Sequence, residues 1–241
     1  MAELPQSLDD AIAQSCTATE AAIAAGYTRL QVELLLPELK PMPVAQQFLP
    51  VFAHLGPDLK VFFTDAGAAA LAKRDWGPVP FQMASLDVAG TRQTSSVEEL
   101  VDPNDRAFLF VGPSSVEVSV AEQVCAAAGD RPVVLLNPRM EDIGIVGLGY
   151  TARQIRDRFL NTFEPCYYLR PSEQAAISRC YPDPWQVWLE REGSYTLLAE
   201  ELQKPNADRL DQIFLTARGV QQQPKRSLIA EMQRFLKALG Q

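Results

Sequence analysis

The sequence predicts an α/β fold with a mainly parallel, Rossmann-like or flavodoxin-like sheet and helices on both faces. Segments with apolar residues at spacings of three and four, typical of amphipathic helices, alternate with short apolar runs typical of strands. Several of these runs are apolar at every position, which indicates strands buried on both faces, as in parallel sheets. A few later strands are expected to be antiparallel.

The helices are predicted from their apolar spacing and from the residues at their ends. In the first helix, Ser7 is a suitable N-cap and Gly26 ends the helix. Pro50 predicts a kink or break in the second. The predicted helices span residues 7–25, 44–55, 68–76, 116–128, 151–163, 208–217 and 227–239.

The strands are predicted from short apolar runs that end at Pro, Gly or polar residues. The first run begins with alternating polarity and becomes continuously apolar before Pro37. Residues 87–106 are rich in Ser, Thr and Asp, so we expect a surface loop there. The predicted strands span residues 29–36, 59–64, 81–86, 107–111, 132–137, 166–170, 186–190 and 195–199.

The domain organisation follows from this pattern and from the length of the chain. We expect residues 1–218 to form a single α/β domain. Residues 219–241 are expected to form a polar linker followed by an amphipathic C-terminal helix.

The charge of the chain excludes some classes of partner. Lys and Arg total 22 against 30 for Asp and Glu, a formal net charge of −8. Such a chain lacks the basic character of general nucleic-acid binders, and anionic lipid would repel it. No segment is apolar enough to span a bilayer, and residues 1–10 lack the features of a signal peptide, so we expect a cytoplasmic location.

Cysteine and histidine usage does not indicate a metal site. Cys16, Cys125, Cys166 and Cys180 form no closely spaced pair, and His54 is the one histidine, so no metal is expected. The thiols are expected to be reduced and structural, with redox sensing by Cys166 or Cys180 as the alternative. No dinucleotide or P-loop glycine motif follows a predicted strand, and no cofactor is expected.

Polar residues follow four of the predicted strands, at 37–40, 64–67, 112–115 and 137–140. In open α/β sheets, ligands bind beyond the carboxyl ends of the strands, so these four segments form a candidate binding rim. The candidate ligand-binding residues are Glu38, Asp65, Ser114, Ser115, Asn137, Arg139, Arg153 and Arg156.

The segment at 112–115 is the part of the rim best suited to an anion. Free amides at a helix N-terminus and two hydroxyl groups, from Ser114 and Ser115, can hold a phosphate or carboxylate. The alternative is that Ser114 and Glu117 form a capping box, a common helix start without a ligand.

A second anion-binding feature is predicted on the helix at 151–163. At about 100° per residue, Arg156 falls within the apolar stripe that Ile155 and Phe159 share. A buried charge needs a partner or a ligand. One interpretation is an anion clamp with Arg139 and Arg153. The alternatives are a side chain that reaches the solvent or an ion pair with one of four carboxylates, namely Glu38, Asp65, Glu141 and Asp142.

Two tryptophans form a candidate partner-binding surface. Trp185 and Trp188 fall on opposite faces of a predicted strand, so one of them could be exposed to a protein partner; packing in the core is the alternative. No catalytic residues are predicted, because one histidine and no G-x-S-x-G motif argue against a Ser-His-Asp hydrolase.

Several strings resemble a known family when they are taken in order. They are YTRLQVEL at 27–34, PELK at 37–40, VFFTDAG at 61–67, DRPVVLLNPR at 130–139, RQIRDRFL at 153–160 and YPDPWQVW at 181–188. Together they resemble the domain-of-unknown-function-1995 family of cyanobacteria and chloroplasts, including plant members that support photosystem II accumulation. The resemblance extends over residues 4–217.

The resemblance implies a soluble auxiliary factor for photosystem II assembly, working at the thylakoid by protein contact. Its implied partners are photosystem II subunits or membrane-insertion factors. A non-enzymatic role is favoured over an enzymatic one. The alternative from the residues themselves is a protein or enzyme that binds a phosphorylated metabolite or nucleotide at the strand-end rim. The oligomeric state stays open.

Overall fold

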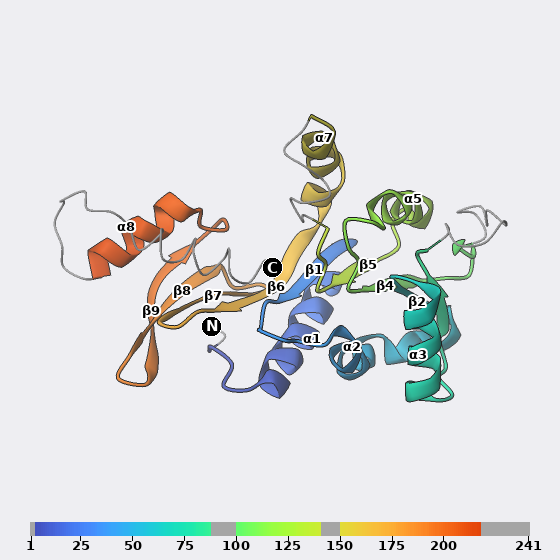
Figure 1. Cartoon of the computed structure of the whole chain (residues 1–241), viewed down its shortest axis with the longest axis horizontal. Coiled ribbons are helices and arrows are strands. Elements are labelled where there is room, and N and C mark those ends of the chain that lie inside the picture. The colour runs from blue at the N-terminus through green and yellow to red at the C-terminus, as the bar shows by residue number, and fades with distance from the viewer. Residues whose placement is uncertain (1–2, 88–99, 141–149, 218–241) are drawn as a thin grey trace.

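The computed structural model describes residues 3–87, 100–140 and 150–217. These residues form one nine-stranded sheet with the order β3-β2-β4-β5-β1-β6-β7-β8-β9 (Figure 1). All pairs from β3 to β6 are parallel, and the pairs from β6 to β9 are antiparallel. The predicted α/β class, with a mainly parallel sheet and later antiparallel strands, is confirmed. The strands are β1 (Arg29–Leu34), β2 (Leu59–Phe63), β3 (Gln82–Ser85), β4 (Ala107–Val111), β5 (Val133–Leu136), β6 (Glu164–Pro171), β7 (Ala175–Cys180), β8 (Trp185–Arg191) and β9 (Ser194–Glu201).

Helices cover both faces of the parallel strands (Figure 1). α1 (Leu8–Ala24), α2 (Pro41–Phe48) and α3 (Ala66–Trp76) contribute to the apolar core on one face. α5 (Val118–Ala128) and α7 (Tyr150–Arg158) contribute to the core on the other. Two 3-10 segments, Leu49–Asp58 and Leu160–Thr162, complete the connections.

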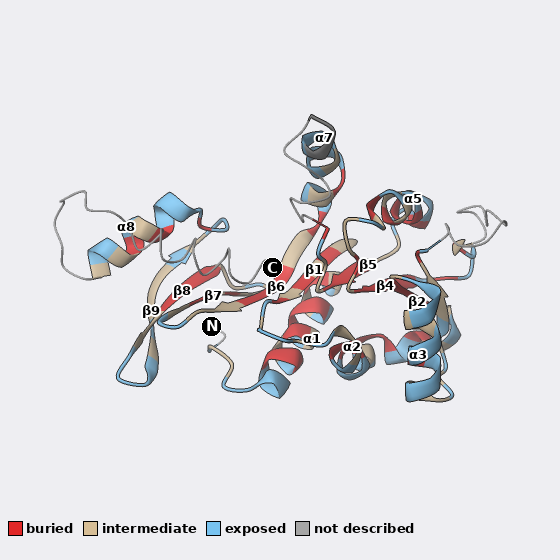
Figure 2. Cartoon of the chain, in the orientation of Figure 1, coloured by how far each residue is buried: buried red, intermediate tan, exposed pale blue. Residues whose placement is uncertain are grey.

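The central strands are buried because both of their faces are covered (Figure 2). All five residues of β2 are buried, and successive side chains of a strand point to opposite faces. Val61 and Phe63 therefore join the core beneath α1 and α2, whereas Phe62 joins the core beneath α5. β4 and β5 are buried throughout in the same way.

The antiparallel strands have a small core of their own. α8 (Ala207–Ala217) packs on them through Leu210 and Ile213, against Val187 of β8. The pairing of Arg170 with Ile177, and of Ile177 with Val187, places this core on the face opposite Leu169. Because Leu169 belongs to the core beneath α1, α8 and α1 lie on opposite faces of the sheet.

The structure corrects several predicted elements. β7 was not predicted, because its sequence mixes small and polar residues and only its neighbours stabilise it as a strand. The helix predicted at 151–163 ends at Arg158, and Phe159 leaves the helical conformation. The break predicted at Pro50 lies one residue earlier, where α2 gives way to the 3-10 segment. Most of the predicted loop at 87–106, and the linker and helix at 219–241, lie outside the described residues.

Candidate functional site

Because the strands are parallel, the carboxyl ends of β4, β5 and β1 lie together at one end of the sheet, as predicted. The segments after β4 and β5 lie side by side, since Ser114 and Arg139 form a parallel bridge. The amide of Arg139 donates to the carbonyl oxygen of Pro113 at 2.7 Å. Gly112, with φ +60°, turns the chain here, and a Cβ atom on it would lie 3.5 Å from Pro41 at the start of α2.

Asn137 joins β5 to β1 at this rim. Its side-chain Oδ1 accepts a hydrogen bond from the main-chain amide of Leu34 at 2.7 Å. Its main-chain amide donates to the carbonyl oxygen of Val32 at 2.7 Å. These two bonds hold Asn137 in a left-handed conformation, φ 49°. The Oδ1 atom therefore satisfies the last amide of β1, and its role at the rim is structural.

The position predicted for an anion beside Ser114 is taken by a carboxylate of the chain itself. Glu117 Oε2 accepts from the amide of Ser114 at 2.8 Å and from its hydroxyl at 2.7 Å. The amide of Val116 donates to Ser114 Oγ at 3.2 Å. Glu117 thus makes one half of a capping box. α5 itself begins at Val118, two residues later than predicted, and Ser115 is half-buried in the same loop.

Asp65 is the N-cap of α3. Its carboxylate accepts from the amide of Ala68 at 2.8 Å and from the hydroxyl of Thr64 at 3.0 Å. These hydrogen bonds, with that from Ala68 the larger effect, hold the pKa of Asp65 below its usual value. Glu38 follows β1 with an exposed side chain and a left-handed backbone, φ 56°.

The prediction that Arg156 lies on a buried stripe is wrong. Arg156 is exposed, as are Arg153 and Arg139, whereas Ile155 is half-buried and Phe159 is buried. The prediction assumes a helix that continues beyond Arg158, but α7 ends there. The apolar stripe along the helix is therefore narrower than predicted. An anion clamp built from these three arginines stays a prediction.

The prediction of an exposed tryptophan is also wrong. Trp185 is 2% exposed and Trp188 is 9% exposed. The two rings do lie on opposite faces: Trp188 Nε1 donates to Ser178 at 2.8 Å, while Trp185 packs 5.0 Å from Tyr168 between ring centroids. Ser178 of β7 and Tyr168 of β6 lie on neighbouring strands, and the pattern of one strand does not reveal such contacts. Lys204 lies above Tyr168 at 4.2 Å.

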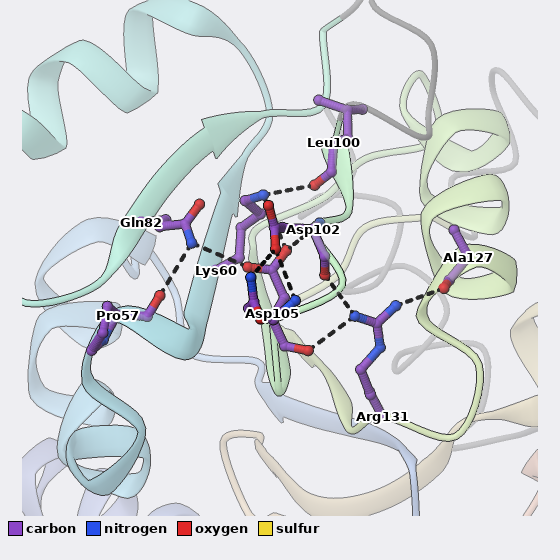
Figure 3. Close-up of polar contacts among 9 residues, drawn as sticks. Pro57, Lys60, Gln82, Leu100, Asp102, Asp105, Ala127 and Arg131 are labelled. Atoms are coloured by element: carbon purple, nitrogen blue, oxygen red, sulfur yellow. Dashed lines mark hydrogen bonds and ion pairs between the residues drawn. The ribbon is translucent and has the colours of Figure 1, made fainter.

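The sequence reasoning missed a buried charged network at the opposite, amino end of the sheet (Figure 3). Lys60 of β2 forms an ion pair with Asp105 at 3.1 Å, and the side chain of Asp105 is fully buried. The side-chain amide of Gln82 donates both to Asp105 Oδ1, at 3.2 Å, and to the carbonyl oxygen of Pro57, at 3.1 Å. A lysine within an otherwise apolar strand was the feature that could have revealed this pair.

Two arginines extend this network to the end of α5. The Arg131 guanidinium donates to the carbonyl oxygens of Asp105 and Ala127, at 2.9 and 2.7 Å. The Arg29 guanidinium donates to the main-chain carbonyl oxygens of Cys125, at 2.7 Å, and Gly129, at 2.6 Å. Cations are favourable beside the unsatisfied carbonyl groups of a helix C-terminus, so both side chains stabilise this end of the fold.

The four cysteines are free, in agreement with the expected reduced thiols. Burial raises the pKa of Cys166 and of Cys180 to about 11, which suppresses the reactive thiolate. These two residues are thus poorly suited to redox sensing.

The rest of the described chain adds two observations. Residues 3–87, 100–140 and 150–217 hold no cluster of three or more His, Cys, Asp or Glu side chains that could bind a metal ion. Among the helices of these ranges, none is both long and apolar enough to cross a bilayer.

The sequence of this fold matches a known protein family. The family model described as Domain of unknown function (DUF1995) matches residues 5–212, which is most of the chain and includes every described strand. The expected family is thereby confirmed, and the chain belongs to the DUF1995 family.

Proposed function

We propose that this protein is an auxiliary factor for photosystem II assembly or accumulation that acts by binding other proteins. It works on the cytoplasmic side of the thylakoid in cyanobacteria, without a reaction of its own. Its partners are photosystem II subunits or membrane-insertion factors. The support for the proposal is the resemblance of the motifs at 27–34, 61–67, 130–139 and 181–188 to family members with this role.

The observation that favours protein contact over a small ligand is the position of Glu117. Its carboxylate already takes both donors that Ser114 offers to an anion. Asp65 and Asn137 are likewise occupied, by Ala68 and by Leu34. These three rim side chains are thus already engaged within the fold, and a phosphate group at Ser114 would have to displace Glu117 from its bonds.

The competing function, a binder of a phosphorylated metabolite or nucleotide, rests on Arg139. Its exposed guanidinium lies in the segment next to Ser114, and no carboxylate contacts it among the described residues. This residue could hold an anion at the margin of the rim if Glu117 moved away. The two functions therefore predict different behaviour of the purified protein.

The experiment is affinity purification of a tagged copy from cyanobacterial cells in mild detergent, quantified by mass spectrometry against an untagged strain. We expect enrichment of photosystem II subunits or membrane-insertion factors. A monomer that brings no such protein with it would overturn the proposal. In parallel, a panel of nucleotides and sugar phosphates should leave the melting temperature of the purified chain unchanged, and a saturable rise would favour the competing function.

A further inference from the structure

The outer strand β3 leaves one row of main-chain groups without a partner among the described residues. β3 pairs with β2 on one side and forms one edge of the sheet. The amide of Leu86 donates to the carbonyl oxygen of Phe63 at 2.7 Å. Because main-chain groups alternate along a strand, Ala84 also faces β2, while Met83 and Ser85 direct their N–H and C=O groups outward.

A groove lies beside this edge, between the end of α3 and the start of β3. Its walls include Pro78, Val79, Phe81 and Met83, and Lys73 contributes the charged side chain. The apolar wall is firmly supported, since Phe81 packs on Trp76 at 6.4 Å between ring centroids and Trp76 in turn packs on Phe63. The groove and the outer edge of β3 are therefore adjacent parts of one surface.

Lys73 gives this surface an uncompensated positive charge. Its side chain is exposed, and no carboxylate contacts its ammonium group among the described residues. The next residue, Arg74, differs in this respect because it pairs with Asp75 at 2.7 Å. An occupant of the groove that carries a carboxylate would meet Lys73, whereas a basic one would be repelled in that position.

The edge is also held in a fixed position. Gln82, the first residue of β3, is anchored through its side chain to Asp105 and to the carbonyl oxygen of Pro57 (Figure 3). A strand that is already in place loses little conformational freedom when another strand is added to it. Addition of an extended peptide to such an edge combines main-chain hydrogen bonds with side-chain pockets.

We infer that β3 and its groove form a docking site for an extended segment of a protein partner with a carboxylate side chain. The segment adds as a strand beside Met83 and Ser85, places apolar side chains against Val79 and Phe81, and sets its carboxylate against Lys73. This inference rests on the proposed function, because it assigns the surface through which the factor holds a protein.

The test uses the full-length chain, labelled for nuclear magnetic resonance, and two synthetic peptides. Both peptides alternate threonine and valine; one carries a glutamate where the other carries a lysine. The acidic peptide should slow hydrogen exchange of the Met83 and Ser85 amides and leave that of Ala84, which faces β2, unchanged. The basic peptide should bind about fivefold more weakly, the upper end of the effect of a charge pair near the surface.

Three variants make the test specific. Lys73→Glu should weaken binding of the acidic peptide about fivefold and improve that of the basic one. Arg74→Glu, the same charge change one residue away, should alter neither by more than about twofold. Ser85→Pro removes an outward N–H group, which an edge strand tolerates, and should abolish binding while the melting temperature stays within a few degrees.

The inference is overturned if the acidic peptide fails to protect Met83 and Ser85, or if Lys73→Glu and Arg74→Glu weaken binding equally. Neither result depends on the partner in the cell, so each is separate from the proposed function. Co-purification from cells tests the surface and the proposed function together. If the wild-type chain enriches photosystem II proteins and the Lys73→Glu and Ser85→Pro variants enrich them equally, the proposed function stands and this docking surface is rejected.

Discussion

Removal of the Asp105 carboxylate tests the buried network at the amino end of the sheet. In the Asp105→Ala variant, Lys60 would keep one hydrogen bond, to the carbonyl oxygen of Leu100 at 3.0 Å. The amide of Asp102, which donates to Asp105 at 2.8 Å, and the side-chain amide of Gln82 would lose an acceptor. The main cost comes from Lys60, because its ammonium group would remain buried without a counter-charge.

The expected magnitude follows from the burial of both partners. The side chains of Lys60 and Asp105 are 9% and 0% exposed, so solvent does not screen the pair. Removal of one partner from a buried ion pair costs about 3–5 kcal/mol. Urea unfolding of the purified chain, followed by circular dichroism, should show a loss of this size. The melting temperature should fall by roughly 10 °C, given the size of the chain.

Two further variants separate the ion pair from the turn around it. Asp102→Ala removes an exposed carboxylate that accepts from Asn104 at 2.8 Å, so a loss of about 1 kcal/mol is expected. The double variant Lys60→Met/Asp105→Leu replaces both charges and should recover most of the stability. If Asp105→Ala costs no more than Asp102→Ala, or if the double variant is no more stable than Asp105→Ala, the reasoning is refuted.

Two substitutions probe the rim, and a labelling experiment probes the thiols. Glu117→Ala frees the donors of Ser114 and should cost about 1 kcal/mol in urea unfolding without creating phosphate affinity; phosphate-dependent stabilisation would instead reveal a latent anion site. Asp65→Ala removes the N-cap of α3 and should cost about 1 kcal/mol at neutral pH. Because the folded-state pKa of Asp65 is lowered, the advantage of the wild type should disappear as pH falls through that pKa, and a pH-independent difference would contradict the assignment. Since burial raises the pKa of Cys166 to about 11, iodoacetamide should label it slowly at pH 8 until urea is added, and rapid labelling of the native chain would contradict this.

Elements buried on both faces were predictable from the sequence alone. β2, β4 and β5 are apolar at nearly every position, and a parallel sheet covered by helices buries both faces of such short runs. β7 was not predictable in this way. Its residues Ser178 and Arg179 find partners on neighbouring elements, Trp188 and Glu164, and those partners decide that the segment is a strand.

The candidate rim was predictable in its location but not in its bonding. Parallel strands place the segments after β4 and β5 together, and the bridge between Ser114 and Arg139 confirms that reasoning. The bond from Leu34 to Asn137 Oδ1 joins residues far apart in the sequence, so no local pattern reports it. The same limit applies to Arg156, because helical periodicity gives an angle around the axis but not the residue at which the helix ends.

The two edges of the sheet differ in a way that supports β3 as the docking edge. β9, at the far edge, ends in Glu200 and Glu201, and charged residues on an edge strand discourage the addition of another strand. Glu201 also pairs with Arg209 of α8 at 2.7 Å, which ties that end of β9 to the helix packed on it. β3 has four uncharged residues, and the groove beside it is lined by Val79, Phe81 and Met83 together with Lys73 and Gln82. An extended acidic segment would therefore meet the carboxylate of Glu200 at β9 and a complementary charge, from Lys73, at β3.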